Sequence, residues 1–464
     1  MIAPPVLLLD LASPAGGIPH ADGAGLSLFW VLPFGGILLS IALLPLLAPK
    51  FWHHHFGKVA AFWALAFFLP FAWRFGYEAA VYELIHTLLL EYLPFIILLV
   101  ALYTVSGGIR VADTIRATPA TNTAILAIGT VLANIMGTTG AAMLLIRPLL
   151  QANAKRRHKV HVVVFFIFLV GNIGGSLTPL GDPPLFLGFL KGVDFFWTAR
   201  HMALPLAVTA SILLAVFYIV DRYCFAKDAS RHDPQPKRAG VLRIEGTQNI
   251  VLLLAIVAAV VLSGVWRPDI GITVYHVRME IQDIVRDGLL IAIGLISLKW
   301  TRAEIRAGHG FTWFPMTEVT KLFAAIFLTI IPAIAILRAG ESGALGFLVK
   351  ALSAHGEPVN ALYFWTTGLL SSVLDNAPTY LIFFNAAGGD PTALMGPEAT
   401  TLLAISAGAV FMGAMTYIGN APNFLIRSIA EERGIEMPSF FGYMLWSTAF
   451  LIPVFVLTTF LFFR

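Results

Sequence analysis

The chain has 464 residues, of which 58% are hydrophobic and only 12% are charged. Its mean hydropathy of +0.82 excludes an ordinary soluble domain and predicts a polytopic membrane protein. The formal charge of +4 comes from Lys and Arg residues scattered along the chain, a pattern typical of a topology signal, so we expect no nucleic-acid partner.

Apolar runs near the roughly 20 residues needed to cross a bilayer recur from one end of the chain to the other. We predict intact spans at residues 26–48, 59–76, 84–105, 197–221, 248–266, 284–299, 320–338 and 440–463. Two further spans, 159–190 and 400–427, are broken by glycines, prolines and polar residues. The predicted fold class is therefore an all-α polytopic protein, integral to the cell (inner) membrane.

Two more apolar segments, 122–150 and 360–386, are interrupted at their centres by "NIMGTTG" and "VLDNAPT". If both crossed the membrane fully, the basic run "AKRRHK" (154–159) would lie outside, against the tendency of Lys and Arg to remain in the cytoplasm. If each enters and leaves on one side, most of the 30 Lys and Arg residues are cytoplasmic. We therefore expect two re-entrant hairpins.

An internal repeat relates the two halves of the chain. A shift of 238 residues places "LANIMGTTGAAMLL" (132–145) on "LSSVLDNAPTYLIF" (370–383), and the same shift places "SLTPLGDPPLFL" (176–187) on "AMTYIGNAPNFL" (414–425). In the predicted topology the two repeats enter the membrane from opposite sides. Inverted repeats place substrate and ion sites at their interface near the membrane centre.

The repeat predicts four regions. They are N-terminal scaffold helices at 1–83, a first repeat at 84–225 with hairpin 122–150 and broken helix 159–190, a cytoplasmic linker with connecting helices at 226–315, and a second repeat at 316–464 with hairpin 360–386 and broken helix 400–427.

The breaks carry the residues that suit an ion. Unwound backbone is tolerated inside a membrane only where protein buries it or where it lines a cavity, and such breaks offer carbonyls to Na⁺ and amides to anions. The candidate ion- or substrate-binding residues are Asn134, Thr138, Thr139, Gly174, Gly175, Thr178, Gly181, Asp182, Asp375, Asn376, Thr379, Thr416, Gly419, Asn420 and Asn423. Thr138, Asp182, Asp375, Asn376 and Asn420 are the expected sodium ligands, with Thr138 and Asp182 in one site and the other three in a second.

Asp182 and Asp375 are the two acids in these breaks. A charge near the bilayer centre costs roughly 2.5–3.5 kcal/mol and usually marks an ion path or a proton relay. One carboxylate can hold a proton and a metal ion in alternation, which is sufficient for exchange. The alternative is that each aspartate only caps the half-helix that follows it.

Residues outside the breaks carry weaker signals. Glu83, His86 and Glu91 lie near the outer end of a predicted span and are expected to be solvated, with a proton route as the alternative. The charged stretch 275–287 is predicted to form an exposed interfacial helix.

These motifs resemble the ion transporter superfamily, which includes NhaD-type sodium/proton antiporters and citrate or divalent-anion/sodium symporters. "NIGGSLTPLGDPP" is similar to the corresponding stretch of both branches, with Asp182 standing where the antiporters carry aspartate. "VLDNAP" resembles the antiporter hairpin motif, which implies that Asp375 and Asn376 are cation ligands, whereas "YIGNAPNFL" is closer to the symporters. The resemblance also implies a homodimer in which a transport domain carrying both hairpins moves like an elevator against a scaffold.

We therefore predict a secondary transporter and not an enzyme. A sodium/proton antiporter is the first choice, and a sodium- or proton-coupled citrate or dicarboxylate symporter is the alternative, because two acids beside an anion site repel the substrate unless Na⁺ or protons neutralise them. An intramembrane aspartyl protease is a minor alternative, because the sequence lacks the Gly-x-Gly-Asp pattern. The expected partners are Na⁺, H⁺, a carboxylate, membrane lipid and a second copy of the chain, with no cofactor.

Overall fold

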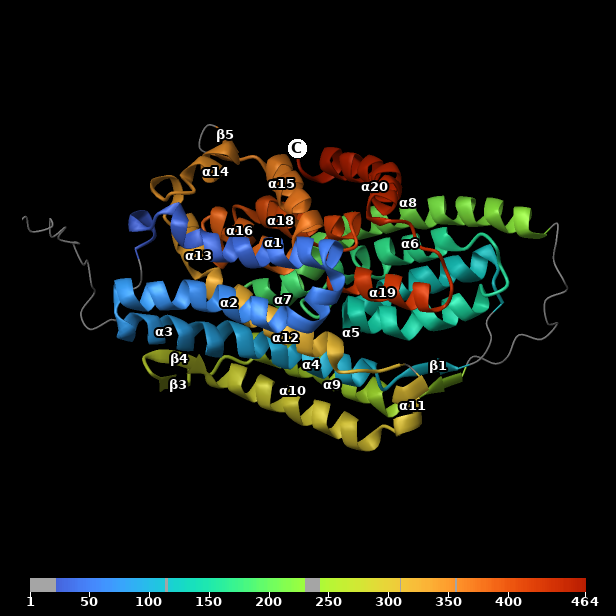
Figure 1. Ribbon diagram of the computed structural model, residues 1–464, viewed down its shortest axis with the longest axis horizontal. Coiled ribbons are helices and arrows are strands. Elements are labelled where there is room, and N and C mark those ends of the chain that lie inside the picture. Colours follow the sequence, from blue (N-terminus) through green and yellow to red (C-terminus); the bar gives the residue numbers. More distant parts are fainter. Residues whose placement is uncertain (1–21, 113–115, 230–242, 309, 355–356) are drawn as a thin grey trace, which may run out of the picture.

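The computed structural model describes residues 22–464 except 113–115, 230–242, 309 and 355–356. Within these residues, seven helices are long and apolar enough to cross a membrane, and the bent pair α12 and α13 makes a possible eighth. Most of the helices run along one common direction (Figure 1), so the short hairpin β3–β4 and the short sheet β1–β2 lie at opposite ends of the molecule. The predicted class, a helical integral membrane protein, is confirmed.

The helices follow the predicted spans closely. They are α1 (Leu32–Leu47), α2 (Pro49–Phe75), α3 (Tyr77–Thr87), a π-helical turn (Leu88–Tyr92), α4 (Leu93–Ser106), α5 (Pro119–Ala152), α6 (Val160–Leu169), α7 (Pro183–Leu190), α8 (Phe195–Ala229), α9 (Gln248–Val265), α10 (Ile281–Trp300), α11 (Ala303–Gly308), α12 (Phe314–Thr329), α13 (Ile331–Arg338), α14 (Gly346–Ala351), α15 (Asn360–Val373), α16 (Asn376–Ala386), α17 (Pro391–Met395), α18 (Ala399–Met412), α19 (Ala421–Glu432) and α20 (Phe440–Phe462).

Short elements complete the chain. The 3₁₀ turns are η1 (Gly23–Gly25), η2 (Leu28–Val31), η4 (Ile173–Ser176), η5 (Gly340–Ser342) and η6 (Gly413–Met415). Three antiparallel strand pairs join β1 (Arg110–Ala112) to β2 (Arg243–Glu245), β3 (Gly271–Val274) to β4 (Val277–Glu280), and β5 (Ser353–Ala354) to β6 (Glu357–Pro358).

The predicted interfacial helix at 275–287 is wrong in its first half. Tyr275 and His276 both have positive φ and form the turn between β3 and β4, and helix α10 begins only at Ile281. Two consecutive residues in this conformation end any helix, because left-handed backbone occurs as single residues or turns.

Both interrupted segments fold back on themselves. Helix α5 breaks at Gly137, whose φ of 76° and ψ of 156° are not helical. The two ends of α5 then meet, since Asn122 and Asn153 exchange side-chain amide hydrogen bonds of 3.0 and 2.9 Å. In the second segment the chain breaks between α15 and α16, and Tyr363 donates its hydroxyl to the carbonyl of Ala386 at 3.4 Å.

The two broken helices are held by glycine contacts. A Cβ on Gly181 would lie 2.1 Å from the carbonyl oxygen of Gly175, and a Cβ on Gly419 would lie 2.7 Å from that of Gly413. The two pairs differ by the offset of 238 residues that also separates Asp182 from Asn420. Only glycine permits so close an approach of two backbone segments.

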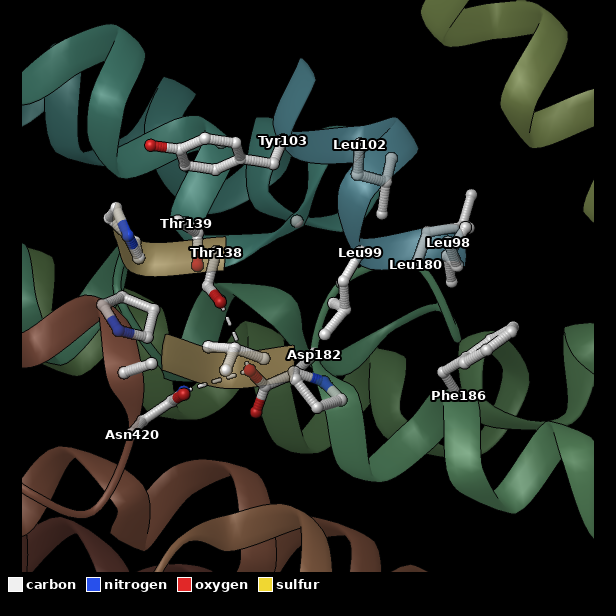
Figure 2. Close-up of a pocket in the computed structure, with 18 of the residues that line it drawn as sticks. Leu98, Leu99, Leu102, Tyr103, Thr138, Thr139, Leu180, Asp182, Phe186 and Asn420 are labelled. Atoms are coloured by element: carbon white, nitrogen blue, oxygen red, sulfur yellow. Dashed lines mark hydrogen bonds between the residues drawn. The ribbon is translucent and has the colours of Figure 1, made fainter. Parts of the chain in front are cut away.

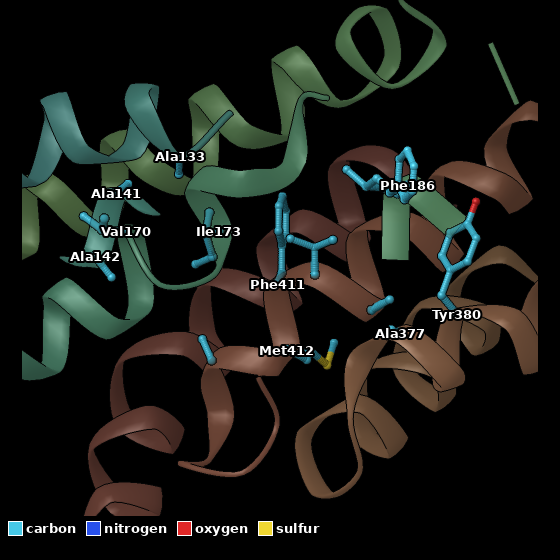
Figure 3. Packing of buried hydrophobic residues seen from close by; sticks show 14 of the residues in the cluster. Ala133, Ala141, Ala142, Val170, Ile173, Phe186, Ala377, Tyr380, Phe411 and Met412 are labelled. Atoms are coloured by element: carbon cyan, nitrogen blue, oxygen red, sulfur yellow. The ribbon is translucent and has the colours of Figure 1, made fainter. Parts of the chain in front are cut away.

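The same offset recurs in hydrogen bonds. Thr178 donates its hydroxyl to the carbonyl of Asn134 at 2.5 Å, and Thr416 donates to the carbonyl of Ser372, also at 2.5 Å. Around these breaks lies one large hydrophobic core, and Figure 3 shows Ile173 of η4 and Phe411 of α18 among its buried side chains.

A buried ionic cluster fastens the base of the first hairpin to α8. Asp221 accepts from Arg156 at 2.6 Å and from Asn122 at 2.9 Å, and its Oδ1 lies 2.8 Å from His161 Nε2. The side chains of Arg156 and Asp221 are almost completely buried. The partners of Asp221 come from the start of α5, from the loop after α5 and from the start of α6. The cluster therefore holds both ends of α5 beside α8.

We predict that Asp221→Ala lowers the free energy of unfolding by about 3 kcal/mol, because the buried Arg156 loses its partner at 2.6 Å and keeps only the longer ion pair with Asp228 at 3.7 Å. Thermal unfolding of the solubilised protein measures the change. The control is Asp269→Asn, which removes the charge of a side chain that is 93% exposed and paired with Arg278, suits the positive φ of this position, and should change little. Equal effects of the two substitutions would contradict this account of the cluster.

Candidate functional site

A cavity lies where all four breaks meet. Its polar end is made by the residues that start the second half of each hairpin and of each broken helix, Thr138, Asp182, Asn376 and Asn420. Its opposite wall is apolar and comes mainly from α4 and α12, with Leu98, Leu99, Leu102, Met316 and Phe323. Figure 2 shows the α4 side chains facing Asp182 across this space.

Asp182 is the centre of the polar end and is 1% exposed. Its Oδ1 accepts from the hydroxyl of Thr138 at 3.2 Å and from Nδ2 of Asn420 at 3.0 Å, as drawn in Figure 2. Its Oδ2 accepts from Nδ2 of Asn376 at 2.6 Å. Three neutral donors therefore satisfy a carboxylate that has been removed from water.

The four residues form two pairs separated by the same number of positions. Asn420 lies 238 residues after Asp182, and Asn376 stands at the same offset from Thr138. The two predicted sodium sites are thus joined in one cluster, because Asn376 and Asn420 donate to Asp182 and not to Asp375. The backbone joins the breaks as well, since the amide of Thr138 donates to the carbonyl of Gly181 at 2.9 Å.

The two aspartates have different surroundings. Asp375 is half-buried, lines the same cavity and caps α16, accepting from the amide of Ala377 at 3.0 Å. Asp182 occupies the equivalent position before α7, but its side chain makes no capping hydrogen bond. The capping alternative therefore fits Asp375 and not Asp182.

Other predicted site residues hold the unwound backbone in place. Asn134 accepts from the amide of Leu177 at 2.7 Å, Thr379 donates to the carbonyl of Asp375 at 2.9 Å, and a Cβ on Gly174 would lie 2.8 Å from Cα of Thr130. Thr178 and Thr416 bind the carbonyls described above. Thr139 lines the cavity, whereas Gly174, Thr178, Thr416 and Asn423 do not.

Two features were missed by sequence reasoning. Asn172 is fully buried in the break between α6 and η4 and binds Asn423 from the other broken helix. Lys191, at the end of α7, forms an ion pair of 2.5 Å with Glu91 in the π-helical turn before α4, so Glu91 is buried and not solvated as predicted. In the sequence, Glu91 and Lys191 each follow directly after an apolar run, and this position is the signal that indicates such a pair.

Between the Asp182 cluster and this ion pair the interior is filled with rings. Phe186 of α7 lies 6.5 Å from Phe95 of α4, and Phe95 lies 4.7 Å from Phe323 and 5.5 Å from Phe327 of α12. The polar cluster lies at the start of α7 and Lys191 at its end. Aromatic side chains and then the ion pair therefore lie along α7 beyond the cavity.

Membrane-spanning helices, and broken helices that meet at one buried carboxylate, define this chain as a secondary transporter. A family model described as "Putative citrate transport" matches residues 23–463, and the chain belongs to that family. The predicted place in the ion transporter superfamily is thereby confirmed, as is the prediction of a transporter and not an enzyme. No curated protein matches the chain in a sequence search.

We predict that Asp375→Asn leaves the stability unchanged, whereas Asp375→Ala lowers the free energy of unfolding by about 1 kcal/mol, because asparagine replaces aspartate as a helix cap and alanine does not. Thermal unfolding of the solubilised protein gives both values. An equal loss in the two variants would show that the charge of Asp375, and not its cap, stabilises the fold.

Proposed function

We propose that this transporter exchanges Na⁺ for H⁺ at Asp182. The observation that carries the proposal is a fully buried carboxylate, held only by hydroxyl and amide donors, in a cavity that no described Lys or Arg residue lines. A cation or a proton supplies the missing positive charge, and only one of them occupies the carboxylate at a time. Asp375, on the same cavity, adds a second negative charge that attracts the cation.

We also propose that the two halves are inverted repeats and that the two folded-back segments are re-entrant hairpins. The recurring offset of 238 residues in glycine contacts and hydrogen bonds supports this, because equal contacts at one offset imply equal local folds. The regions 84–225 and 316–464 are then the repeats, 1–83 is scaffold, and 226–315 is the cytoplasmic linker with connecting helices. A homodimer, in which the scaffold makes the dimer contact, belongs to the same proposal.

Transport requires the site to face each side of the membrane in turn. In the proposed cycle the hairpins and broken helices move as one body against a wall formed by α4 and α12. The cavity lies between these two parts, and the pair of Glu91 with Lys191 bridges them. The ion pair and the rings beside it close one exit and must separate when that exit opens.

We predict that Na⁺ alone drives proton movement in liposomes that contain the purified protein and a pH-sensitive dye, with no organic substrate present. Asp182→Asn should abolish this movement, because an amide neither binds a proton nor carries the charge that holds Na⁺. Asp375→Asn, which keeps the helix cap, should retain exchange but require a higher Na⁺ concentration for half of the maximal rate.

The outcome that contradicts antiport is silence with Na⁺ alone followed by transport when citrate is added. Unchanged exchange in Asp182→Asn would instead overturn the role given to this residue. Thermal unfolding of each variant controls for loss of fold.

A second candidate function, cotransport of citrate or a dicarboxylate with Na⁺ or H⁺, is favoured by the family match. In this case the cation at Asp182 neutralises the site before the anion binds. The half-helix starts give limited help to an anion, because Pro183 and Pro184 carry no amide hydrogen at the first two positions of α7. The liposome experiment distinguishes the two functions by whether the carboxylate is required.

We predict that joining positions 91 and 191 stops transport almost completely. Cys224 is the one native cysteine, so Glu91→Cys and Lys191→Cys are introduced together with Cys224→Ser, and a short reducible thiol cross-linker is applied. Reduction should restore transport. The control is each single cysteine treated with the same reagent, and full activity of the cross-linked protein would mean that this contact does not open during the cycle.

A further inference from the structure

The side-chain oxygen of Asn172 is buried and accepts no hydrogen bond from the described residues. Its Nδ2 donates to the carbonyl of Ile167 at 2.8 Å and to Oδ1 of Asn423 at 2.6 Å, and among the described residues its Oδ1 has no partner. Both amide hydrogens are used, so the amide cannot be rotated without losing both bonds. Asn172 therefore presents an oxygen, and only an oxygen, on its other side.

Asn423 fixes this orientation from the second broken helix. Its Nδ2 donates to the carbonyl of Gly413 at 2.8 Å and to that of Thr416 at 2.9 Å, which leaves its oxygen to accept from Asn172. Since both functions of the Asn423 amide are taken within the protein, we assign Asn423 to positioning Asn172 and not to binding an ion directly.

Gly413 lies close to the Asn172 oxygen and has no side chain there. A Cβ at this position would lie 3.0 Å from Oδ1 of Asn172, 3.4 Å from the carbonyl oxygen of Gly419 and 3.6 Å from Nδ2 of Asn376. The last of these atoms belongs to the amide that donates to Asp182 at 2.6 Å. The oxygens of Asn172 and Gly419 and the amide of Asn376 are thus gathered around the place that a side chain at position 413 would take.

The amide of Asn376 connects the two places. Its Oδ1 is also buried and has no hydrogen-bond partner among the described residues, and its Nδ2 is engaged only with Asp182. A cation at Asp182 would displace this donor, and a half-turn of the amide would then present the Asn376 oxygen to the same cation. Hard cations such as Na⁺ are bound by carboxylate and amide oxygens and by backbone carbonyls.

We propose that Asn172 is a further cation-binding residue, and that its side-chain oxygen and the Gly419 carbonyl form the inner half of a Na⁺ site whose outer half is Asp182 and Asn376. This inference rests on the proposed exchange at Asp182 and adds to it a ligand from the first unwound segment. It also gives both broken helices a share in one ion, so that the ion ties the two repeats together.

Binding of Na⁺ alone tests the proposal. Thermal unfolding of the solubilised full-length protein is recorded in NaCl with choline chloride as the balancing salt, and the Na⁺ concentration that gives half of the stabilisation is determined. We expect at least a tenfold increase of this concentration in Asn172→Ala. Gly413→Ala should have the same effect, because it places a methyl group 3.0 Å from the Asn172 oxygen without removing any donor.

The matched control is Gly294→Ala on α10, where a Cβ would lie 4.0 Å from Cα of Ala101, its nearest neighbour outside the helix. The Na⁺ response of this variant should not change. The proposal for Asn172 is overturned if Asn172→Ala and Gly413→Ala both respond to Na⁺ as the unmodified protein does. Exchange at Asp182 still stands in that case, provided that Gly294→Ala responds and Asp182→Asn does not. No response of the unmodified protein to Na⁺ would overturn both.

Discussion

A single carboxylate that must be satisfied away from water governs this fold. Asp182 is 1% exposed, and a buried charge without hydrogen-bond partners is costly. Its three donors are side chains that come from three different breaks in the chain and must all reach one point. The breaks solve this problem. Glycines at 175 and 181 allow the unwound chain to pass close to itself, and the turn at Gly137 lets the hairpin tip deliver Thr138. The large apolar core around the breaks holds the unwound segments in these positions, so the position of one charge accounts for much of the irregular backbone.

The equivalent positions of the two halves carry different residues at the site, and the difference matters most at Asp182. At the offset of 238 residues, Asp182 corresponds to Asn420, which donates to it at 3.0 Å. A second aspartate at position 420 would place two carboxylates within hydrogen-bond distance, where both cannot remain ionised. An asparagine in the equivalent position gives a donor in place of a repelling charge. The site therefore carries one buried charge, with Asp375 half-buried beside the cavity and engaged in a helix cap.

Hydropathy and the repeat were sufficient to predict the helices, the four breaks and the residues Thr138, Asp182, Asn376 and Asn420. They predicted two sites and not one cluster of all four residues, because an offset equates positions but does not say that equivalent positions face each other. Asn376 was therefore grouped with its neighbour Asp375, whereas its side chain binds Asp182. Asn172 stood unnoticed beside a run of glycines, since its role depends on Asn423, 251 residues away. The turn at Tyr275 and His276 was missed because non-glycine residues adopt positive φ only uncommonly.

The family match and the site geometry are compatible if the cation binds first. A carboxylate substrate that entered an unoccupied site would meet Asp182 and Asp375 with no described lysine or arginine on the cavity wall, and the prolines at the start of α7 remove amides that could hold it. Neutralisation of Asp182 removes the main repulsion and frees the Asn376 and Asn420 amides from the carboxylate. These amides then become donors for an anion. In both proposed functions the cation binds at Asp182. In exchange a proton then replaces it on the other side of the membrane, whereas in cotransport a carboxylate joins it.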